Sequence, residues 1–329
     1  MLDKIAVSLK NSYRNKVDKR KRLQITRNLK NLCIKALNQS MDVHEMRHMA
    51  RRIIPDYDIY KQTGFPESFA IPSIDAAKQI VSDIINSKLF FQFIQNLIHL
   101  DQKGFMGKKT RISYLNDIIK EIYNNGYIFN LENEIFVENS KVLKTRNWGA
   151  LQEGETYSMA FLSIDIIGNT KLVQKYPKHL VETTYTELNY IVQNAIDKRN
   201  GRIWMWEGDG GIIAFFFGNR NRDATLSAIE ILNNMFLYNR TLCKLTEPIR
   251  IRASVHSGVC EYTERNDYFK KMDVMKTIDV MEKKHSKAKS ICISYPVRMM
   301  LDGFIANQFL PLGSNNTSQF YRYDLEWDK

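Results

Sequence analysis

The chain has few cysteines, and their spacing gives them no common task. Four cysteines are scattered along 329 residues, and none forms a Cys-x-x-Cys pair. They are Cys33, Cys243, Cys260 and Cys292. This pattern excludes a disulfide-stapled fold and is typical of thiols that a reducing cytoplasm keeps unpaired. We therefore expect a cytoplasmic protein.

Long apolar runs are also missing. No stretch reaches the roughly 18 apolar residues of a membrane-spanning helix, so the sequence predicts no membrane span. The first residues, MLDKIAVSLKNSYRNK, lack the apolar core and cleavage site of a signal peptide. Internal repeats and low-complexity segments are absent as well. With 44% hydrophobic and 26% charged residues, the chain must contain a packed globule, and its length suffices for two domains.

Positive charge is concentrated in the first half of the chain. The net charge is +12. Residues 1–150 hold 25 Lys and Arg against 15 Asp and Glu, whereas residues 151–329 hold 23 against 21. Residues 1–35 alone hold 11 basic and 2 acidic side chains. Such a tract could contact nucleic acid or an anionic membrane, but a solvated basic arm explains it equally well, and we favour the arm.

The spacing of apolar residues predicts a mostly helical N-terminal region, residues 1–150. Residues 25–53 look helical, 56–72 read as a loop, and 74–100 read as two helices. Residues 113–139 predict a helix followed by a hairpin. This region could be regulatory. A winged-helix DNA-binding module is the alternative, but nothing marks a recognition helix, so we do not expect a nucleic-acid partner.

A short zinc-like motif lies in this region. Residues 44–48 read HEMRH, which places His44 and His48 on one helix face with Glu45 beside them. Pro55 ends the helix before any third ligand. We therefore interpret the motif as part of a polar surface helix.

From Tyr157 onward the pattern changes to regular α/β. Strands are expected at 159–166, 202–206, 212–217, 249–258 and 291–294, helices at 168–200 (broken at Pro177), 222–244 and 277–287, and a closing hairpin at 308–325. The order β-α-β-β-α-β predicts an antiparallel sheet of ferredoxin-like type with helices on one face, an α/β (α+β) fold.

Two carboxylates stand out in this domain. Asp165 ends the apolar strand in FLSIDIIGNT, and Asp209 lies in the EGDGG turn. Each acid alone could be a helix cap or a turn residue. In a β-α-β-β sheet, however, the first strand commonly lies beside the following hairpin, so both acids should converge at one edge. Paired carboxylates suit hard divalent cations. Gly168, Asn169 and Thr170 then open a helix whose backbone N–H groups suit a phosphate.

Three segments together carry a family resemblance: FLSIDIIGNTKL, GRIWMWEGDGGIIAFF and IRIRASVHSG. Residues 156–325 resemble the catalytic domain of class III nucleotide cyclases. The resemblance implies that Asp165, Asp209 and the carbonyl of Ile166 bind two Mn²⁺ or Mg²⁺ ions. It also implies attack of a ribose 3′-hydroxyl on the α-phosphate of a nucleoside triphosphate, and a homodimer with sites at its interface.

The sequence departs from the purine cyclases at the positions that read the base. Met205 stands where the family has a Lys or Glu, and alternation predicts that it faces away from Trp204 and Trp206. The family's ribose and transition-state element corresponds to Asp279 and Lys283, in place of Asn and Arg. Lysine keeps the charge but loses the bidentate fork.

The sequence keeps the two expected metal-binding aspartates but lacks the residues with which the family recognises a purine. In this combination it resembles the pyrimidine cyclases of bacterial Pycsar anti-phage systems. That resemblance implies production of cUMP or cCMP as a messenger for a separate effector, and we favour UTP over CTP. Three alternatives stay open: an adenylate or guanylate cyclase, an inactive cyclase-fold nucleotide sensor, and a DNA-binding regulator.

Overall fold

The computed structural model describes residues 23–104, 110–312 and 319–325. Most of the basic tract therefore lies outside the described residues. No helix in these three ranges is both long and apolar enough to cross a bilayer.

The described chain forms two compact units. One comprises residues 23–144 with Trp148–Ala150, and the other comprises Thr145–Asn147 with the residues from Leu151 onward. We describe each unit by itself. The assignment of a regulatory role to residues 1–150 and a catalytic role to 151–329 stays a prediction.

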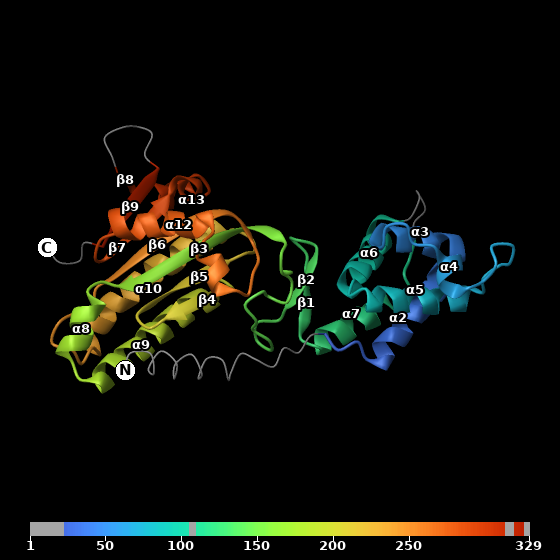
Figure 1. Cartoon of the computed structure of the whole chain (residues 1–329), viewed down its shortest axis with the longest axis horizontal. Helices are drawn as coiled ribbons and strands as arrows, with labels where there is room; N and C mark the ends of the chain where they lie inside the picture. The colour runs from blue at the N-terminus through green and yellow to red at the C-terminus, as the bar shows by residue number, and fades with distance from the viewer. Residues whose placement is uncertain (1–22, 105–109, 313–318, 326–329) are drawn as a thin grey trace. The chain divides into compact units, whose positions relative to one another are not determined.

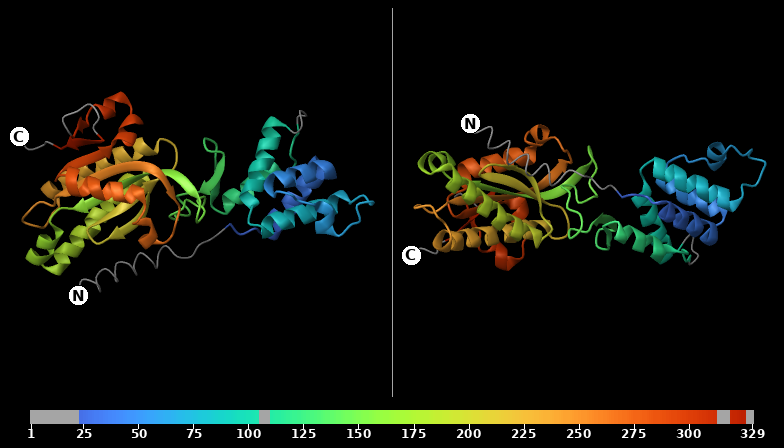
Figure 2. Two further views of the ribbon diagram at one scale, coloured as in Figure 1. Left: turned by 45° about the horizontal axis from the view of Figure 1, so that its top comes forward. Right: turned by 90° about the horizontal axis from the view of Figure 1, so that it is seen from below.

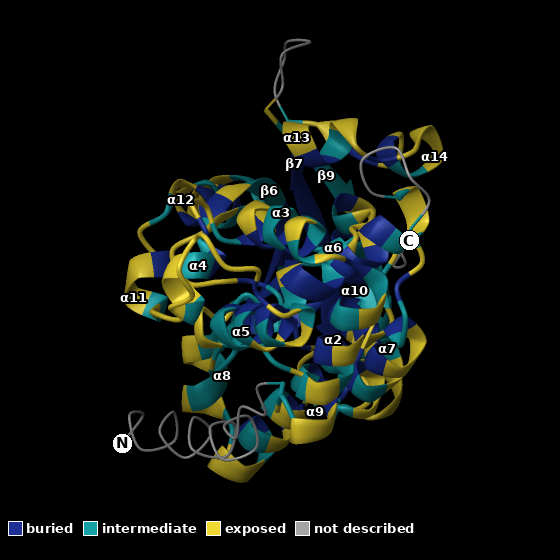
Figure 3. Ribbon diagram, turned by 90° about the vertical axis from the view of Figure 1, so that its right-hand side faces the viewer, coloured by how far each residue is buried: buried dark blue, intermediate teal, exposed yellow. Residues whose placement is uncertain are grey.

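The first unit is a helical bundle with one hairpin (Figure 1). Its elements are α2 (Arg27–Ser40), α3 (Val43–Ile53), α4 (Ile59–Thr63), α5 (Ser73–Asn86), α6 (Phe90–Lys103), α7 (Leu115–Asn124), β1 (Tyr127–Asn130) and β2 (Ile135–Glu138). The helices turn their apolar faces into one core that includes Leu37, Met49 and Ile80, and Figure 3 shows this burial in dark blue. The predicted helices and hairpin are confirmed.

One detail of this unit differs from the prediction, and a second concerns the HEMRH motif. The segment predicted as a loop contains α4, because Asp58 caps its first turn and Gly64 ends it in the left-handed conformation. In the HEMRH motif, Glu45 accepts from the backbone N–H of Asp42 in a capping box, so its carboxylate is already engaged. The rings of His44 and His48 contact each other, with centroids 4.6 Å apart.

The second unit is built on a seven-stranded sheet of order β4-β5-β3-β6-β7-β9-β8. Its strands are β3 (Thr156–Ile166), β4 (Arg202–Glu207), β5 (Gly210–Phe215), β6 (Ile251–Glu261), β7 (Ser290–Ser294), β8 (Leu310–Pro311) and β9 (Phe320–Asp324). Its helices are α8 (Asn169–Lys175), α9 (Lys178–Asp197), α10 (Arg220–Thr241), α11 (Asn266–Phe269), α12 (Asp273–Val280), α13 (Tyr295–Met299), α14 (Gly303–Ala306) and the π-helix η1 (Met281–His285).

The central strand β3 separates two differently covered faces. Alternate residues of β3, among them Leu162 and Ile164, join a buried core with residues of α9 and α10. We call this side the α10 face, and Figures 1 and 2 show both helices packed along it. The opposite side, which we call the α12 face, carries Phe161, Ser163 and Asp165. Helices α11 and α12 lie there, and Phe161 packs against Phe269.

The predicted α/β fold class is confirmed, with one correction to the sheet. Strands β4, β5, β3 and β6 pair antiparallel, as the β-α-β-β-α-β order requires. Strands β6 and β7 pair parallel, because the helices α11, α12 and η1 form a crossover that returns the chain to the same end of the sheet.

The predicted placement of the two tryptophans was wrong. A bulge shifts the register of β4 so that Ile203 faces Ile213 while Met205 faces Ile212. Trp206 therefore packs at the α10 face, whereas Trp204 packs against Phe161 on the α12 face. A one-residue insertion breaks the alternation on which the prediction depended.

We expect protonation of His256 on β6 to contribute to the pH dependence of the free energy of unfolding. Its Nδ1 lies 2.9 Å from Oγ of Ser294, and burial lowers its pKa to about 4. The unfolded state takes up this proton near pH 6.5, before the folded state does. Stability should therefore fall as the pH drops from 6.5 to 4, with a slope of up to about 1.4 kcal/mol per pH unit.

Urea unfolding at several pH values measures this slope. His256→Gln keeps a polar side chain but has no proton to take up, so its curve should lack this contribution. Equal slopes for wild type and variant would contradict the assignment.

Candidate active site

Asp165 lies where three strands meet. It is the penultimate residue of β3 and faces Gly210 of β5 on one side and Arg252 of β6 on the other. Residues directly opposite each other in a sheet share a face, so the carboxylate of Asp165 and the guanidinium of Arg252 are neighbours. The Asp165 side chain keeps 27% of its surface exposed. It can therefore still bind a ligand from solvent.

Asp209 reaches the same place from the β4–β5 turn. Gly208 precedes it with φ +61°, a conformation that favours glycine. A Cβ on Gly210 would lie 2.3 Å from the carbonyl oxygen of Ile164, so only glycine permits this close approach of β5 to β3. The predicted convergence of Asp165 and Asp209 at one edge agrees with this geometry.

The electrostatics of Asp209 include a contribution from Asp165. Burial raises the pKa of Asp209, the negative charge of Asp165 raises it further, and a backbone hydrogen bond and Arg252 lower it. A divalent cation would relieve this repulsion, so the pair suits one. The described residues contain no cluster of three or more His, Cys, Asp or Glu side chains that could hold a metal. A two-carboxylate site would therefore leave other positions to backbone, water and phosphate oxygens.

Arg252 was not singled out from the sequence, although it binds Asp165 directly. Its Nε and Nη2 donate to Oδ2 of Asp165 at 3.0 and 2.7 Å. Its Nη1 donates to the backbone carbonyl of Glu282 at 2.9 Å. One guanidinium thus joins β3, β6 and η1. The alternation of IRIRASVHSG places Arg252 on one face, and only the strand register shows what it meets.

Glu282 is a second acid that sequence reasoning missed. Its carboxylate accepts a hydrogen bond from the hydroxyl of Ser163, two residues before Asp165. Burial raises the pKa of Glu282, Ser163 lowers it, and the charge of Asp165 raises it. The carboxylate of Glu282 therefore lies within electrostatic reach of Asp165. No motif in the sequence distinguishes Glu282 from the charged residues around it.

The predicted phosphate segment begins at a left-handed glycine. Gly168 has φ +77° and precedes α8, which starts at Asn169. The side-chain oxygen of Asn169 accepts a hydrogen bond from the hydroxyl of Tyr185 on α9, and Gly168 and Thr170 are exposed. Burial raises the pKa of Tyr185 and the charge of Asp209 raises it further, so Tyr185 lies within electrostatic reach of Asp209. Ile166 packs its side chain in the α10-face core, and only its backbone could serve a cation.

Asp279 and Lys283 are paired with each other at the surface. Nζ of Lys283 lies 2.8 Å from Oδ2 of Asp279, and the two side chains are 69% and 55% exposed. They lie at the end of α12 and in η1, the same segment that turns Glu282 toward Ser163. Their predicted role in the reaction stays a prediction.

Met205 lies on the α12 face, because its partner Ile212 pairs in turn with Ser163. The same face carries Asp165. The predicted base reader Met205 and the predicted metal ligand Asp165 therefore lie on one side of the sheet.

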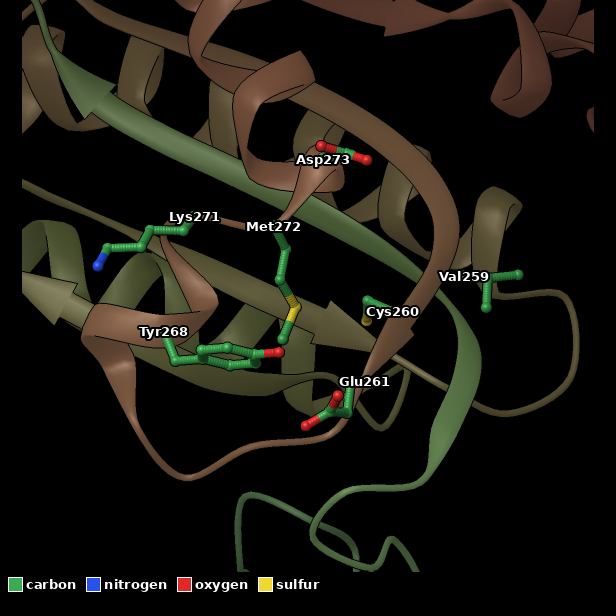
Figure 4. Close-up of a pocket in the computed structure, with 7 residues that line it drawn as sticks. All are labelled: Val259, Cys260, Glu261, Tyr268, Lys271, Met272 and Asp273. Carbon is green, nitrogen blue, oxygen red and sulfur yellow. The ribbon is translucent and has the colours of Figure 1, made fainter.

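A cavity of about 340 Å³ lies at the start of α12. Its lining includes Tyr268, Lys271, Met272 and Asp273. Figure 4 shows the side chain of Met272 extending toward the ring of Tyr268, while Lys271 points away. The carboxylate of Asp273 is 95% exposed and pairs with Lys276 at 2.8 Å. The start of α12 is thus hollowed, and Met272 and Tyr268 contribute a thioether and an aromatic ring to the lining beside charged side chains.

Comparisons with known proteins assign no activity. No family model and no curated protein matches the chain. Solved structures align with about half of it. The guanylyl cyclase domain of the RhoGC fusion protein from Blastocladiella emersonii is 18% identical, with a TM-score of 0.42, and covers 52% of this chain and 98% of its own. The adenylyl cyclase CyaB from P. aeruginosa is 17% identical, with a TM-score of 0.44, and the alignment covers 54% of this chain and 100% of that one.

Another aligned structure is the guanylate cyclase domain of RhGC from Catenaria anguillulae in complex with GTP. It is 19% identical, with a TM-score of 0.41, and the alignment covers 51% of this chain and 96% of that one. At such low identities and TM-scores, these similarities do not decide what this chain binds or converts.

Neutralising Asp209 and neutralising Asp165 should change the Tm of the metal-free protein in opposite directions. Asp209 has a raised pKa, so its charge destabilises the fold at neutral pH, and Asp209→Asn should raise Tm by roughly 2 °C or more. Asp165 compensates Arg252, so Asp165→Asn should lower Tm.

Differential scanning calorimetry in EDTA checks both signs. Because both variants remove a carboxylate of the pair, both should also lose Mn²⁺ binding in titration calorimetry. A stabilised Asp165→Asn, or unaltered Mn²⁺ affinity in either variant, would contradict this description of the site.

Proposed function

We propose that this chain is a metal-dependent nucleotide cyclase that converts a pyrimidine nucleoside triphosphate, UTP in preference to CTP, to its 3′,5′-cyclic monophosphate and pyrophosphate. The observation that carries the proposal is the convergence of Asp165 and Asp209 beside the start of α8. A carboxylate pair next to exposed backbone N–H groups can hold both a cation and a polyphosphate.

The proposed reaction needs little covalent chemistry from the protein. The ribose 3′ oxygen bonds to the α-phosphorus, the bond from that phosphorus to the bridging oxygen of the β-phosphate breaks, the 3′-hydroxyl proton passes to solvent, and pyrophosphate leaves. Divalent cations, when bound, supply Lewis-acid activation of the hydroxyl and neutralise phosphate charge. Asp165, Asp209 and the carbonyl of Ile166 would hold them.

The residues of the chain orient the triphosphate. The N–H of Ile167 already donates to the carbonyl of Arg250 at 2.8 Å, so the phosphate segment starts at Gly168. The backbone of Gly168, Asn169 and Thr170 would bind the phosphates, and Tyr185 fixes the side chain of Asn169. Lys283 would add positive charge near the reacting phosphate if its bond to Asp279 opens.

The chemistry of the base-reading positions supports a pyrimidine. Met205 on the α12 face is a thioether, which accepts hydrogen bonds only weakly. A purine cyclase needs strong polar groups there, because discrimination between bases depends on hydrogen bonds that the wrong base leaves unmade. The loss of these groups favours a smaller base read by other contacts.

Two further parts of the proposal extend beyond one chain. The chain would act as a head-to-tail homodimer with active sites at the interface, and the exposed Asp279–Lys283 pair would be accessible to a second copy. The cyclic product would serve as a second messenger in bacterial anti-phage defence and act on a separate effector. The proposal places no nucleic acid at the active site.

Incubation of the purified protein with ATP, GTP, CTP or UTP and Mn²⁺ tests the proposal. Chromatography against 3′,5′-cyclic standards should show a cyclic pyrimidine. Asp165→Ala and Asp209→Ala should each lower the rate roughly 100-fold or more, because each removes a group that stabilises developing charge. The matched control is Asp197→Ala, an exposed aspartate of α9, which should keep full activity.

Each other outcome is informative. A cyclic purine would keep the reaction but overturn the interpretation of Met205. Absence of product from all four nucleotides, together with measurable nucleotide binding, would favour the inactive sensor. Full turnover by either alanine variant would contradict the metal assignment.

A further inference from the structure

We infer that Arg252 is a positioning residue of this active site: it holds Asp165 in its metal-binding orientation and fixes η1 to the same carboxylate. The inference rests on the proposed function and adds a residue to it. Nothing in the spacing of the sequence motifs assigns Arg252 a role; the assignment comes from its contacts.

Arg252 contacts only one of the two carboxylate oxygens of Asp165, so the two oxygens can have different roles. Both hydrogen bonds from the guanidinium, from Nε and Nη2, end on Oδ2. Oδ1 is left as the oxygen that can face a cation. Because two N–H groups converge on one oxygen, the carboxylate cannot rotate without breaking both bonds. Arg252 thus fixes the direction in which Oδ1 points.

The third N–H group of Arg252 links the acid to η1. Nη1 donates to the carbonyl of Glu282 at 2.9 Å. Side-chain bonds on either side strengthen this link: Ser163 of β3 donates to the carboxylate of Glu282, and Oγ of Ser254 on β6 lies 2.8 Å from Oγ of Ser286. The segment is therefore attached to both β3 and β6.

This attachment matters because η1 carries Lys283, and Asp279 lies one turn earlier. A π-helical turn is a local irregularity that neighbouring contacts must hold in place, and such turns are frequent at functional sites. Through Arg252, the position of Lys283 depends on the position of Asp165. The metal acid and the proposed ribose-binding segment are thereby aligned by one side chain.

Lysine could not perform both tasks. Its single ammonium nitrogen cannot donate twice to Asp165 and also reach the Glu282 carbonyl with the fixed planar geometry of a guanidinium. The charge of Arg252 has a second effect, since it lies close to the cation position and repels a cation there. Removing Arg252 should therefore impair turnover more than metal binding.

The test compares Arg252→Lys and Arg252→Gln with wild type. Arg252→Gln should lower kcat roughly 100-fold with KM for the nucleotide within about threefold, because misplacement of a reacting group costs about this much. Arg252→Lys keeps the positive charge but not the planar set of N–H donors, so its kcat should lie between those of wild type and Arg252→Gln. The Kd for Mn²⁺ should be unchanged or lower in both variants, while the Mn²⁺ paramagnetic resonance spectrum should broaden as the ligand geometry becomes heterogeneous.

The matched control is Arg199→Gln. Arg199 pairs with Glu230 at 2.8 Å, and these side chains are 21% and 19% exposed, similar to the 26% and 27% of Arg252 and Asp165. This pair joins the turn after α9 to α10, away from the α12 face. The control should lose stability without changing kcat or the Mn²⁺ spectrum.

Two results would overturn the inference. Unchanged kcat in Arg252→Gln would show that the site does not need the contact. A loss of Mn²⁺ binding in proportion to a fall in Tm would show that Arg252 only supports the fold. If wild-type protein makes no cyclic nucleotide, the proposed function fails, but the Mn²⁺ spectrum still tests Arg252, and an unaltered spectrum in Arg252→Gln would then sink the inference separately.

Discussion

The register of β3 against its two neighbours is the constraint on which the site depends. Pairing places Asp165 opposite Gly210 and Arg252 at the same time. The missing side chain of Gly210 lets β5 approach, which brings Asp209 near, and the side chain of Arg252 supplies the compensating charge. A slip of one residue would turn Asp165 into the apolar core of the α10 face and separate all three groups.

The acidic side chains around Asp165 are partly buried. Burial disfavours their charged forms, and a bound cation would favour them. The negative charge of Asp165 acts on both Asp209 and Glu282, and the positive charge of Arg252 opposes it at each of them. Burial is the largest cause of the raised pKa values of Asp209 and Glu282, and the negative charge of Asp165 raises both further. A bound cation would offset part of this negative charge, as the proposed metal-dependent reaction would require.

Sequence patterns predicted most elements, and the failures have local causes. Alternation and helical spacing located the strands and helices of both units, because apolar side chains must face a core. The bulge at Trp204, the short helix α4 and the parallel pairing of β7 were not predicted. A bulge adds a residue without a sequence signature, a five-residue helix is too short to show a period, and strand direction depends on how the crossover helices pack.

By itself, the sequence determined that Asp165 ends a strand, that Asp209 lies in a glycine-rich turn, and that Gly168 precedes a helix. These are local consequences of apolar runs and of backbone conformations that glycine favours. Only the tertiary structure decided that Arg252, 87 residues from Asp165, binds its carboxylate, and that Glu282, 119 residues from Ser163, turns toward that serine. Such partners are chosen by strand register and helix packing, which bring distant residues together whatever their spacing in the chain.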